Sequence, residues 1–408
     1  MKIVEINSLD YASTGNICFQ LADAARLRGH EVYVATPRRS DVRAEESAFT
    51  LHFGSEGEIK RHICGTALTG GNGFFSKQAT KELVARLEEI EPDLVHLHNL
   101  HGYCFHLPTL FAYLKASGVK VVWTLHDCWT FTGRCPHFTL SGCENWKTGC
   151  GNCSYPKKEY PISMFDTTRR QWKRKKELFC SLPEKDLTIV TPSDWLGSLA
   201  KISYLGKYPI RTIHNGIDLS VFHPVESEFR KKHGLEGKKI FLGVAFGWGP
   251  AKGLDVFLEL AKRLGEDEAI VLVGTDEETD KLLPPKILSI HATHNREELA
   301  EIYSSADVFL NPTREDTFPT VNIEALACGL PVVTFRTGGS PEIPDQTCGI
   351  VVDYNNTEAF LSAALETLRN SPFSKEACIK RGVQFEQAHQ TEKYIDLFEN
   401  LVSGGNNP

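Results

Sequence analysis

An expected strand, an acidic loop and an expected helix follow one another from Asn311 to Pro331 and carry the residues best suited to chemistry. Backbone N–H groups that open such a helix could hold a diphosphate, and a carboxylate one turn further on could bind ribose hydroxyls. Glu324 has this second position, in a helix that is otherwise apolar, where a carboxylate is costly unless it is paired or bound to a ligand. The residues expected to meet the ligand are Glu315, Asp316, Thr317, Phe318, Thr320, Val321 and Glu324.

Two glycine-bearing turns in the C-terminal half could approach the same ligand. Lys252 follows Gly247 in a turn between an expected strand and an expected helix, and its ammonium group could neutralise a diphosphate leaving group. A solvated lysine in a loop is the alternative interpretation. Gly338 and Gly339 form a loop that is tight enough to pass close to a bound molecule.

The N-terminal half offers a histidine and a further glycine turn. His126 follows an expected strand, where its ring could donate or accept a proton near neutral pH, although a purely structural histidine is the alternative. Gly15 lies where the first expected helix opens, and it would let the backbone come close to an anion there. A plain strand-to-helix turn would have the same sequence.

Four cysteines are crowded into a loop rich in glycine, asparagine and threonine. Cys150 and Cys153 have the pair spacing of a zinc knuckle, and Cys135 and Cys143 could complete a structural zinc site. Cys128 or His137 could take the place of one of these ligands. Free thiols and a redox-labile disulfide are the competing interpretations.

The segment Arg169–Lys176 is strongly basic and falls in an expected helix with Trp172 and Phe179. A solvated helix face is the simpler interpretation. The alternative is docking to anionic membrane lipid, where a polyprenyl-diphosphate-linked acceptor would be found.

Short β-branched runs alternate with helical patterns along the chain, which indicates parallel sheets built of strand–helix–strand units. We predict two Rossmann-like, doubly wound α/β domains that face each other across a cleft, with ligands at the carboxyl ends of the strands. The domains are residues 1–220, with the cysteine-rich loop 128–153, and residues 221–385; residues 386–408 should form a helix that packs back on the N-terminal domain, and then a disordered tail. Expected strands are 2–7, 31–36, 93–98, 119–125, 187–191, 210–214, 240–245, 269–273, 287–291, 308–311 and 331–335, and expected helices include 17–28, 254–264, 296–305 and 321–327.

The composition is that of a globular protein, with 408 residues, 41% hydrophobic and 24% charged. A net charge of −7 gives no sign of nucleic-acid binding. The first residues read as a strand rather than as a signal peptide, and no apolar stretch approaches the roughly 20 residues needed to span a bilayer. We therefore expect a cytoplasmic protein.

Several segments, in the same order along the chain, resemble the retaining glycosyltransferases of family 4, which have the GT-B architecture. The region from Asn311 to Pro331 is similar to that family's donor motif of two glutamates separated by seven residues. The other segments that carry the resemblance are Pro192–Leu196, His214–Asp218 with Phe222, Lys252–Asp255, and Thr337–Glu342 followed by Gly349.

The resemblance implies a role for individual residues. Glu324 would hold the ribose, Lys252 would contact the diphosphate, His126 would lie near the transferred sugar, and Gly15 would lie close to the donor phosphate and the acceptor. Fixed positive groups and N–H dipoles would stabilise the leaving diphosphate, so no cofactor is required for catalysis. The leaving phosphate would itself take the acceptor proton, which gives transfer with retention of configuration.

The chain departs from the family pattern at two positions. The first glutamate of the motif falls on Asp316, one methylene shorter, with Glu315 beside it. The arginine that usually precedes the lysine by five residues falls on Gly247, so one diphosphate contact is missing unless Arg314 or Arg336 supplies it.

The resemblance implies a hexosyltransferase that moves a sugar from a nucleotide-sugar donor to a glycan or polyprenyl-diphosphate-linked acceptor. The cysteine-rich loop also resembles a subset of bacterial enzymes of capsule and surface polysaccharide biosynthesis. With the basic segment Arg169–Lys176 docked to lipid, the protein would contact the inner face of the cell membrane. Two alternatives remain. One is a sugar-nucleotide epimerase on the same architecture, and the other is a weakly catalytic partner protein that binds nucleotide sugar, which the departures at Asp316 and Gly247 would favour.

Overall fold

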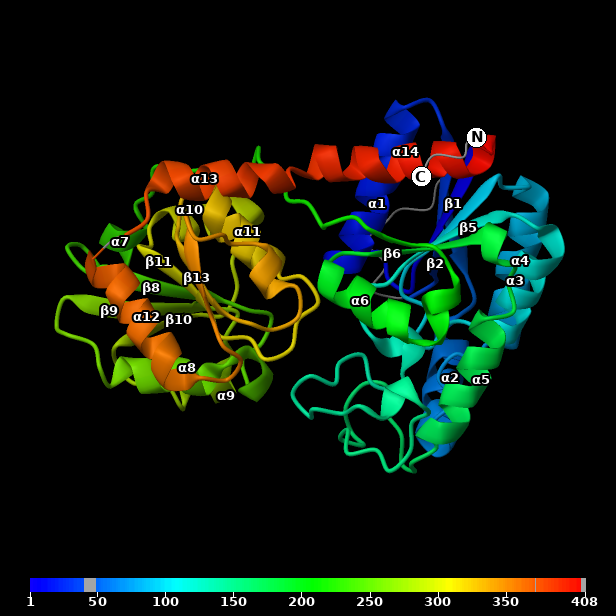
Figure 1. Cartoon of the computed structure of the whole chain (residues 1–408), viewed down its shortest axis with the longest axis horizontal. Coiled ribbons are helices and arrows are strands. Elements are labelled where there is room, and N and C mark those ends of the chain that lie inside the picture. Colours follow the sequence, from blue (N-terminus) through cyan, green and yellow to red (C-terminus); the bar gives the residue numbers. More distant parts are fainter. Residues whose placement is uncertain (40–48, 371, 405–408) are drawn as a thin grey trace. The chain divides into compact units, whose positions relative to one another are not determined.

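Two parallel sheets, each with helices on both faces, form the two units of the computed structural model, which describes residues 1–39, 49–370 and 372–404 (Figure 1). The first unit comprises Met1–Ile213 together with the residues from Thr391 onward, and the second comprises His214–Gln390. The α/β class with two doubly wound sheets is therefore confirmed.

The second unit begins at His214 rather than after residue 220, because the start and the end of this unit are paired with each other. The Ile217 N–H donates to the Phe385 carbonyl (3.0 Å), and the Gln387 N–H donates to the Ile217 carbonyl (2.8 Å). The helix expected from residue 386 is α14 (Gln387–Ser403), which belongs to the first unit from Thr391 onward. The last residues of the expected disordered tail, 405–408, lie outside the described residues.

The sheet of the first unit has seven parallel strands in the order β3-β2-β1-β4-β5-β6-β7, so the strand order reverses between β1 and β4. Such a reversal opens a crevice at the carboxyl ends of the strands in this class of fold. The strands are β1 (Lys2–Ile6), β2 (Glu31–Pro37), β3 (Thr50–Phe53), β4 (Leu94–Leu97), β5 (Lys120–Thr124), β6 (Leu187–Thr191) and β7 (Ile210–Thr212). The helices are α1 (Ala12–Leu27), α2 (Glu56–Thr69), α3 (Lys77–Ile90), α4 (Leu107–Ser117), α5 (Thr168–Phe179), α6 (Asp194–Ile202) and α14.

Both faces of this sheet are apolar, as expected for a parallel sheet covered on both sides. One face packs against α3, α4 and α5, and its cluster includes Trp123 and Phe179. The other face packs against α1 and α14, and its cluster includes Ile3, Ile395 and Phe398 (Figure 1). The last helix therefore completes the core of the unit to which the first strand belongs.

The second unit repeats the plan with six parallel strands in the order β10-β9-β8-β11-β12-β13, and the order reverses between β8 and β11. Its strands are β8 (Lys239–Val244), β9 (Glu268–Val273), β10 (Ile287–Ile290), β11 (Val308–Asn311), β12 (Val332–Phe335) and β13 (Gly349–Val352). Its helices are α7 (Phe229–Lys232), α8 (Leu254–Ala261), α9 (Glu277–Asp280), α10 (Arg296–Ser304), α11 (Thr320–Ala327), α12 (Thr357–Asn370) and α13 (Lys375–Gly382).

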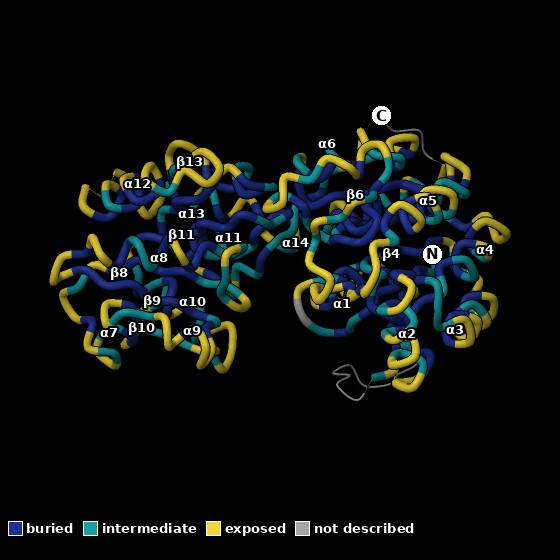
Figure 2. Tube along the Cα trace, turned by 90° about the horizontal axis from the view of Figure 1, so that it is seen from below, coloured by how far each residue is buried: buried dark blue, intermediate teal, exposed yellow. Residues whose placement is uncertain are grey.

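Burial follows the same pattern in each unit: the central strands are buried, edge strands such as β3, β7 and β10 are largely half-buried, and the helices expose one side (Figure 2). Among the described residues, no helix combines the length and the apolar character needed to cross a bilayer.

Candidate functional site

Three loops at the carboxyl ends of β8, β11 and β12 carry the expected donor residues of the second unit. Lys252 ends a short 3-10 helix (Pro250–Lys252) after β8, and its Nζ lies 2.8 Å from Oδ2 of Asp316 in the loop after β11. The structure thus brings together the two side chains that were expected to meet the diphosphate and the sugar. Both remain partly exposed, with 33% of the Lys252 side chain and 22% of the Asp316 side chain accessible.

The loop after β12 is pressed against this pair. A Cβ on Gly338 would lie only 1.7 Å from the backbone oxygen of Asp316, so the two loops touch only because residue 338 has no side chain. The Gly339 N–H donates to the Thr317 carbonyl (3.1 Å). The positions of Asp316 and Thr317 are therefore fixed by backbone contacts.

Arg314 does not replace the arginine that is missing at residue 247. Its guanidinium is buried, and it donates to both Asp255 carboxylate oxygens (2.7 Å each), to the Pro250 carbonyl (2.7 Å) and to Asn355 Oδ1 (2.7 Å). This ion pair lowers the pKa of Asp255. Arg314 therefore holds the Lys252 turn against the loop after β11. The other candidate is Arg336, whose Nε lies 3.4 Å from Asp353 Oδ1 and whose side chain is 60% exposed.

The backbone at Gly247 explains why an arginine does not suit this position. Its φ of +85° lies in the left-handed region, which favours glycine, although a Cβ would meet nothing within 4 Å. The obstacle to a side chain is therefore backbone conformation rather than space. The neighbouring Trp248 ties the turn to β9, because its indole N–H donates to the Val273 carbonyl (3.0 Å).

Glu324 lies on α11 and has a partner within the protein. The Tyr303 hydroxyl, on α10, donates to its Oε2 (3.0 Å). Burial raises the pKa of Glu324, and the Tyr303 hydrogen bond opposes this effect. The expectation that this carboxylate is paired or ligand-bound is thus met in part by Tyr303, and Glu324 remains half-buried.

The remaining expected donor residues differ in what they offer. Phe318 is buried, its ring stacks on His214 with centroids 4.9 Å apart, and its backbone N–H donates to Asp316 Oδ1 (3.3 Å). Thr320 and Val321 open α11 and are partly exposed, and no side chain caps this helix. Glu315 is also half-buried.

In the first unit, Gly15 lies inside a helix and not in a turn before it. The helix α1 begins at Ala12, earlier than the expected residue 17. A Cβ on Gly15 would lie 2.7 Å from the backbone carbon of Asp10, so the loop after β1 folds directly onto the first turn of α1. Glycine is therefore required at residue 15 for packing, independently of any ligand.

His126 follows β5, is half-buried, and ends a chain of buried polar groups that the sequence analysis missed. Its Nε2 lies 3.0 Å from His98 Nδ1, and the two rings stack with centroids 5.3 Å apart. His98 Nε2 lies 2.8 Å from Glu5 Oε2, and His96 Nδ1 lies 2.7 Å from the same oxygen. The signal in the sequence was the two-residue spacing of His96 and His98, which places both side chains on one face of a strand.

The four cysteines of the proposed zinc site lie in one neighbourhood of the first unit. Burial raises the pKa of Cys135 to about 12 and that of Cys150 to about 11, and the charges of Cys143 and Cys153 act on the Cys150 thiol. The Cys150 sulfur accepts a hydrogen bond from the Gly133 N–H (3.1 Å). Among the described residues, however, no three of these sulfurs lie within 4.8 Å of one another, so zinc binding would require them to move together.

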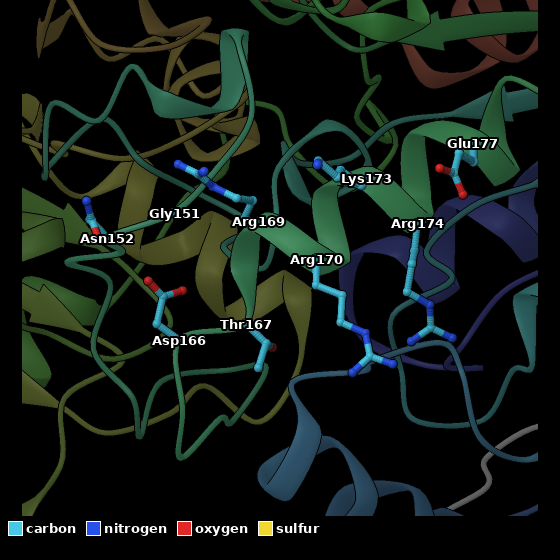
Figure 3. A pocket seen from close by; sticks show the side chains of 9 residues that line it. All are labelled: Gly151, Asn152, Asp166, Thr167, Arg169, Arg170, Lys173, Arg174 and Glu177. Carbon is cyan, nitrogen blue, oxygen red and sulfur yellow. The ribbon is translucent and has the colours of Figure 1, made fainter.

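The basic segment forms α5, as expected, but it is not simply a solvated face. Lys175 is buried: its ammonium group donates to the Trp129 carbonyl and lies 3.8 Å from the centre of the Trp129 ring. Burial lowers the pKa of Lys175 to about 7. Four of the other basic side chains, Arg169, Arg170, Lys173 and Arg174, border a hollow of about 600 Å³ beside the cysteine-rich loop (Figure 3). It is lined by Gly151, Asn152, Asp166, Thr167, Arg169, Arg170, Lys173, Arg174 and Glu177.

Solved structures that match over nearly the whole chain, both sheets included, are glycosyltransferases of the GT-B type. Sucrose-phosphate synthase from Thermosynechococcus elongatus matches with a TM-score of 0.72 at 15% identity, over 99% of this chain and 100% of that one. Anabaena Alr3699/HepE in complex with UDP-glucose matches with a TM-score of 0.66 at 12% identity, over 99% of this chain and 100% of that one. The likeness shows that the chain has the GT-B fold.

The sequence then identifies the family. Residues 14–221 match the family model described as Glycosyltransferase Family 4, and residues 238–370 match the one described as Glycosyl transferases group 1. This chain belongs to glycosyltransferase family 4, and it is a glycosyltransferase.

Two relatives illustrate its place among these enzymes. The colanic acid biosynthesis glycosyl transferase WcaC of Escherichia coli (strain K12) is 23% identical over 319 residues, which are 76% of this chain and 77% of WcaC. The D-inositol 3-phosphate glycosyltransferase of Mycobacteroides abscessus is 30% identical over 243 residues, which are 54% of this chain and 53% of that enzyme.

Proposed function

We propose that this protein transfers a hexosyl group from a nucleotide sugar to a glycan or polyprenyl-diphosphate-linked acceptor, with retention of configuration, during synthesis of a bacterial surface or capsular polysaccharide. The observation that carries the donor assignment is the meeting of Lys252 and Asp316 beside the uncapped start of α11. Two comparisons support it: HepE has been solved with UDP-glucose, and WcaC is named for colanic acid biosynthesis.

On this proposal, each group of the second unit acts on a different part of the donor. Lys252 neutralises charge that develops on the leaving diphosphate, together with N–H groups at the start of α11. Glu324 accepts hydrogen bonds from ribose hydroxyls, and Asp316 accepts one from a hydroxyl of the sugar. The N–H groups at the start of α11 are fixed before the reaction, so they need little reorganisation as charge develops.

In the first unit, His126 contacts the transferred sugar. The nucleophile is an acceptor hydroxyl, and the leaving phosphate oxygen takes its proton on the face from which the diphosphate departs. The bond to the diphosphate breaks and the bond to the acceptor forms on the same face, which retains the configuration. No cofactor takes part in this step.

Two further proposals concern the surroundings of the site. Cys135, Cys143, Cys150 and Cys153 bind one structural zinc ion, which the shared neighbourhood of their thiols supports. The hollow beside α5 contacts anionic lipid at the cytoplasmic face of the membrane. This proposal is supported by three exposed basic side chains that line the hollow, Arg169, Arg170 and Lys173. Sedimentation with vesicles of phosphatidylglycerol should then capture the wild-type chain but not Arg170→Ala/Lys173→Ala, and phosphatidylcholine vesicles should capture neither.

A thermal-shift titration with UDP, GDP, ADP and dTDP, each with and without EDTA, tests the donor site. A ligand that binds the native state raises its melting temperature. The expected result is a rise with one of these nucleotides that EDTA does not abolish, followed by transfer in an acceptor screen. Turnover of the donor without any acceptor would point to an epimerase. Binding without transfer to any acceptor would point to a partner protein.

A further inference from the structure

A buried carboxylate and two histidines face one another at the point where the strand order of the first unit reverses. Glu5 on β1 is paired in register with His96 on β4, and His98 lies two residues further along, on the same face. Glu5 and His96 are 0% exposed and His98 is 1% exposed. A polar cluster this deep is costly unless its hydrogen bonds are made.

The Glu5 carboxylate determines the position of the proton on His98. Burial alone would raise the pKa of Glu5, but the charge of His96 and the hydrogen bonds from both histidines bring it down to about 2. Glu5 is therefore an anion, which can only accept hydrogen bonds. Since His98 Nε2 lies 2.8 Å from Glu5 Oε2, this nitrogen must carry a proton.

The state of His98 in turn determines that of His126. Burial lowers the pKa of His98 to about 4, so the ring is neutral at neutral pH. A neutral ring with its proton on Nε2 can only accept at Nδ1, which lies 3.0 Å from His126 Nε2. His126 must therefore be the donor. Burial and the neighbouring His98 also lower the pKa of His126, so His126 is neutral as well, with its proton on Nε2.

We propose that Glu5 and His98 are positioning residues for His126: they fix the His126 ring with its proton on Nε2, so that Nδ1 accepts a hydrogen bond from a hydroxyl group of the bound sugar. This inference rests on the proposed function, in which His126 contacts the transferred sugar. A carboxylate that orients a functional histidine through the opposite ring nitrogen is a known device in metal sites and hydrolases. Here a second histidine lies between the carboxylate and the functional ring.

Other titratable groups also face this chain of three residues, from each packed element. Cys18 on α1 and Tyr394 on α14 lie near Glu5, and His101 and Asp127 lie near His126. His101 Nε2 lies 2.8 Å from Asp127 Oδ2, so the charge of Asp127 has a partner of its own. The Glu5 carboxylate is the charged group that touches His98 directly.

The direct test is the protonation state of the ring nitrogens, read by two-bond ¹H–¹⁵N correlation NMR on the full chain labelled at histidine, at pH 7.5. His126→Gln assigns the His126 signals. We expect wild-type His126 to be protonated at Nε2 and unprotonated at Nδ1. The reverse pattern, or a cationic ring, would overturn the proposal without any further variant. So would a metal ion bound stoichiometrically to Glu5, His96 and His98, detected by elemental analysis.

Glu5→Gln separates positioning from a merely structural role. The amide nitrogen of Gln can donate to His98 Nε2, which sends the His98 proton to Nδ1 and the His126 proton to its own Nδ1. A second population of His126, protonated at Nδ1, should therefore appear, and kcat should fall by roughly 10-fold or more while KM for the donor changes little. Tyr394→Phe is the control: it removes a hydroxyl from the same buried cluster, which accepts a hydrogen bond from Thr124 (3.2 Å), and it leaves Glu5, His96 and His98 in place, so the His126 proton should stay on Nε2. An unchanged His126 tautomer in Glu5→Gln would contradict the inference.

Loss of the sugar contact and loss of the positioning role would give different results. Full transfer activity in His126→Gln would remove the sugar contact and this part of the proposed function, and the Nδ1 acceptor would then have no sugar to bind. Loss of transfer in His126→Gln, with the wild-type proton found on Nδ1, would keep the proposed function and overturn the positioning role.

Discussion

Lys252 Nζ lies 2.8 Å from the Asp316 carboxylate, although the two residues belong to different loops of the second unit. Each partner is partly accessible, so the contact is weaker than a fully buried ion pair would be and can be opened. A diphosphate at this position would compete with Asp316 for the ammonium group. The pair therefore links the affinity for the nucleotide to the residue expected to recognise the sugar.

Lys252→Ala should lower kcat for transfer by about 100-fold or more, because a fixed positive group at the leaving diphosphate is lost. Asp316→Asn should separate two effects: UDP or its equivalent should bind at least as tightly, since Lys252 is released, while transfer falls. Calorimetry with the nucleotide and steady-state kinetics measure the two quantities. Lys262→Ala is the control, because Lys262 pairs with Glu259 on an exposed helix face of the same unit. Full activity of Lys252→Ala would exclude its assigned role.

Glu324→Ala should abolish transfer and weaken nucleotide binding while the fold is retained, because the ribose contact is lost. Tyr303→Phe removes only the 3.0 Å hydrogen bond to the same carboxylate. We expect a smaller loss in this variant, with the pKa of Glu324 raised further, so that activity declines at a higher pH on the acid side than in wild type. Equal and large losses of stability in both variants would indicate that Glu324 serves the fold and not the donor.

Gly15→Ala should destabilise the protein even though alanine is the better helix former by about 1 kcal/mol. The added methyl group would lie 2.7 Å from backbone at Asp10, which cannot give way as a flexible side chain can. Gly57→Ala in α2 is the matched control, since its Cβ would meet nothing closer than 4.0 Å. Thermal unfolding should show a lower midpoint for the first variant and an unchanged or higher midpoint for the second.

Acidification should destabilise the first unit well above the pH at which carboxylates titrate. Burial lowers the pKa of His62 from 6.5 to about 3, so below pH 6.5 the unfolded chain takes up a proton that the native chain does not. His62 Nε2 accepts a hydrogen bond from the Gly73 N–H (3.1 Å), which a proton on Nε2 would break. Stability is therefore fully present above pH 6.5 and is lost as the pH falls.

The loss attributable to His62 between pH 6.5 and pH 4 should be on the order of 3 kcal/mol, at about 1.4 kcal/mol for each unit of pH. Urea unfolding across this range measures it. His62→Gln should be less stable at pH 7.5 and should show a shallower dependence on pH. If the stability of His62→Gln depends on pH as steeply as that of wild type, another group, for instance His98, must cause the loss of stability in acid.

Elemental analysis of the purified chain should find about one zinc per molecule, and Cys150→Ser/Cys153→Ser should contain none. Chelation should then lower the melting temperature of the wild-type chain. Cys64→Ser is the control, because Cys64 is exposed and lies outside this loop. Absence of metal, with Cys135, Cys143, Cys150 and Cys153 all found as reduced thiols, would favour the free-thiol interpretation.

The strands were the most predictable part of the fold, because a strand buried on both faces is a nearly continuous apolar run. The expected ranges 187–191 and 308–311 coincide with β6 and β11. The start of α1 was wrong because Ala12 to Asn16 are small or polar and show no apolar period, and the N-cap residue Tyr11 offers no side-chain cap. There, tertiary contact with the loop after β1 decides the structure.

The residues of the candidate site could be predicted where they belong to a motif that is continuous in the sequence. They could not be predicted where their contacts depend on which strands are neighbours in the sheet. Lys252, Asp316 and Glu324 are marked by their turns and helix. The partnership of Glu5 with His98 depends on β1 and β4 being neighbours, which no periodicity reveals. In the same way, the burial of Lys175 is hidden in a run of basic residues whose other members are exposed or half-buried.

The contribution of α14 to the first unit has a consequence for how the chain acquires its structure during synthesis. Tyr394, Ile395 and Phe398 fill the face of the sheet that holds Ile3, Val122 and Val190. The N-terminal half leaves the ribosome first, yet only α1 covers that face until the residues after Gln390 have been made. All strands of the second unit have been synthesised by then, so this unit can fold before the first unit has its final helix. Until α14 is made, the first unit exposes apolar surface, and chaperone binding or rapid completion of synthesis must prevent its aggregation.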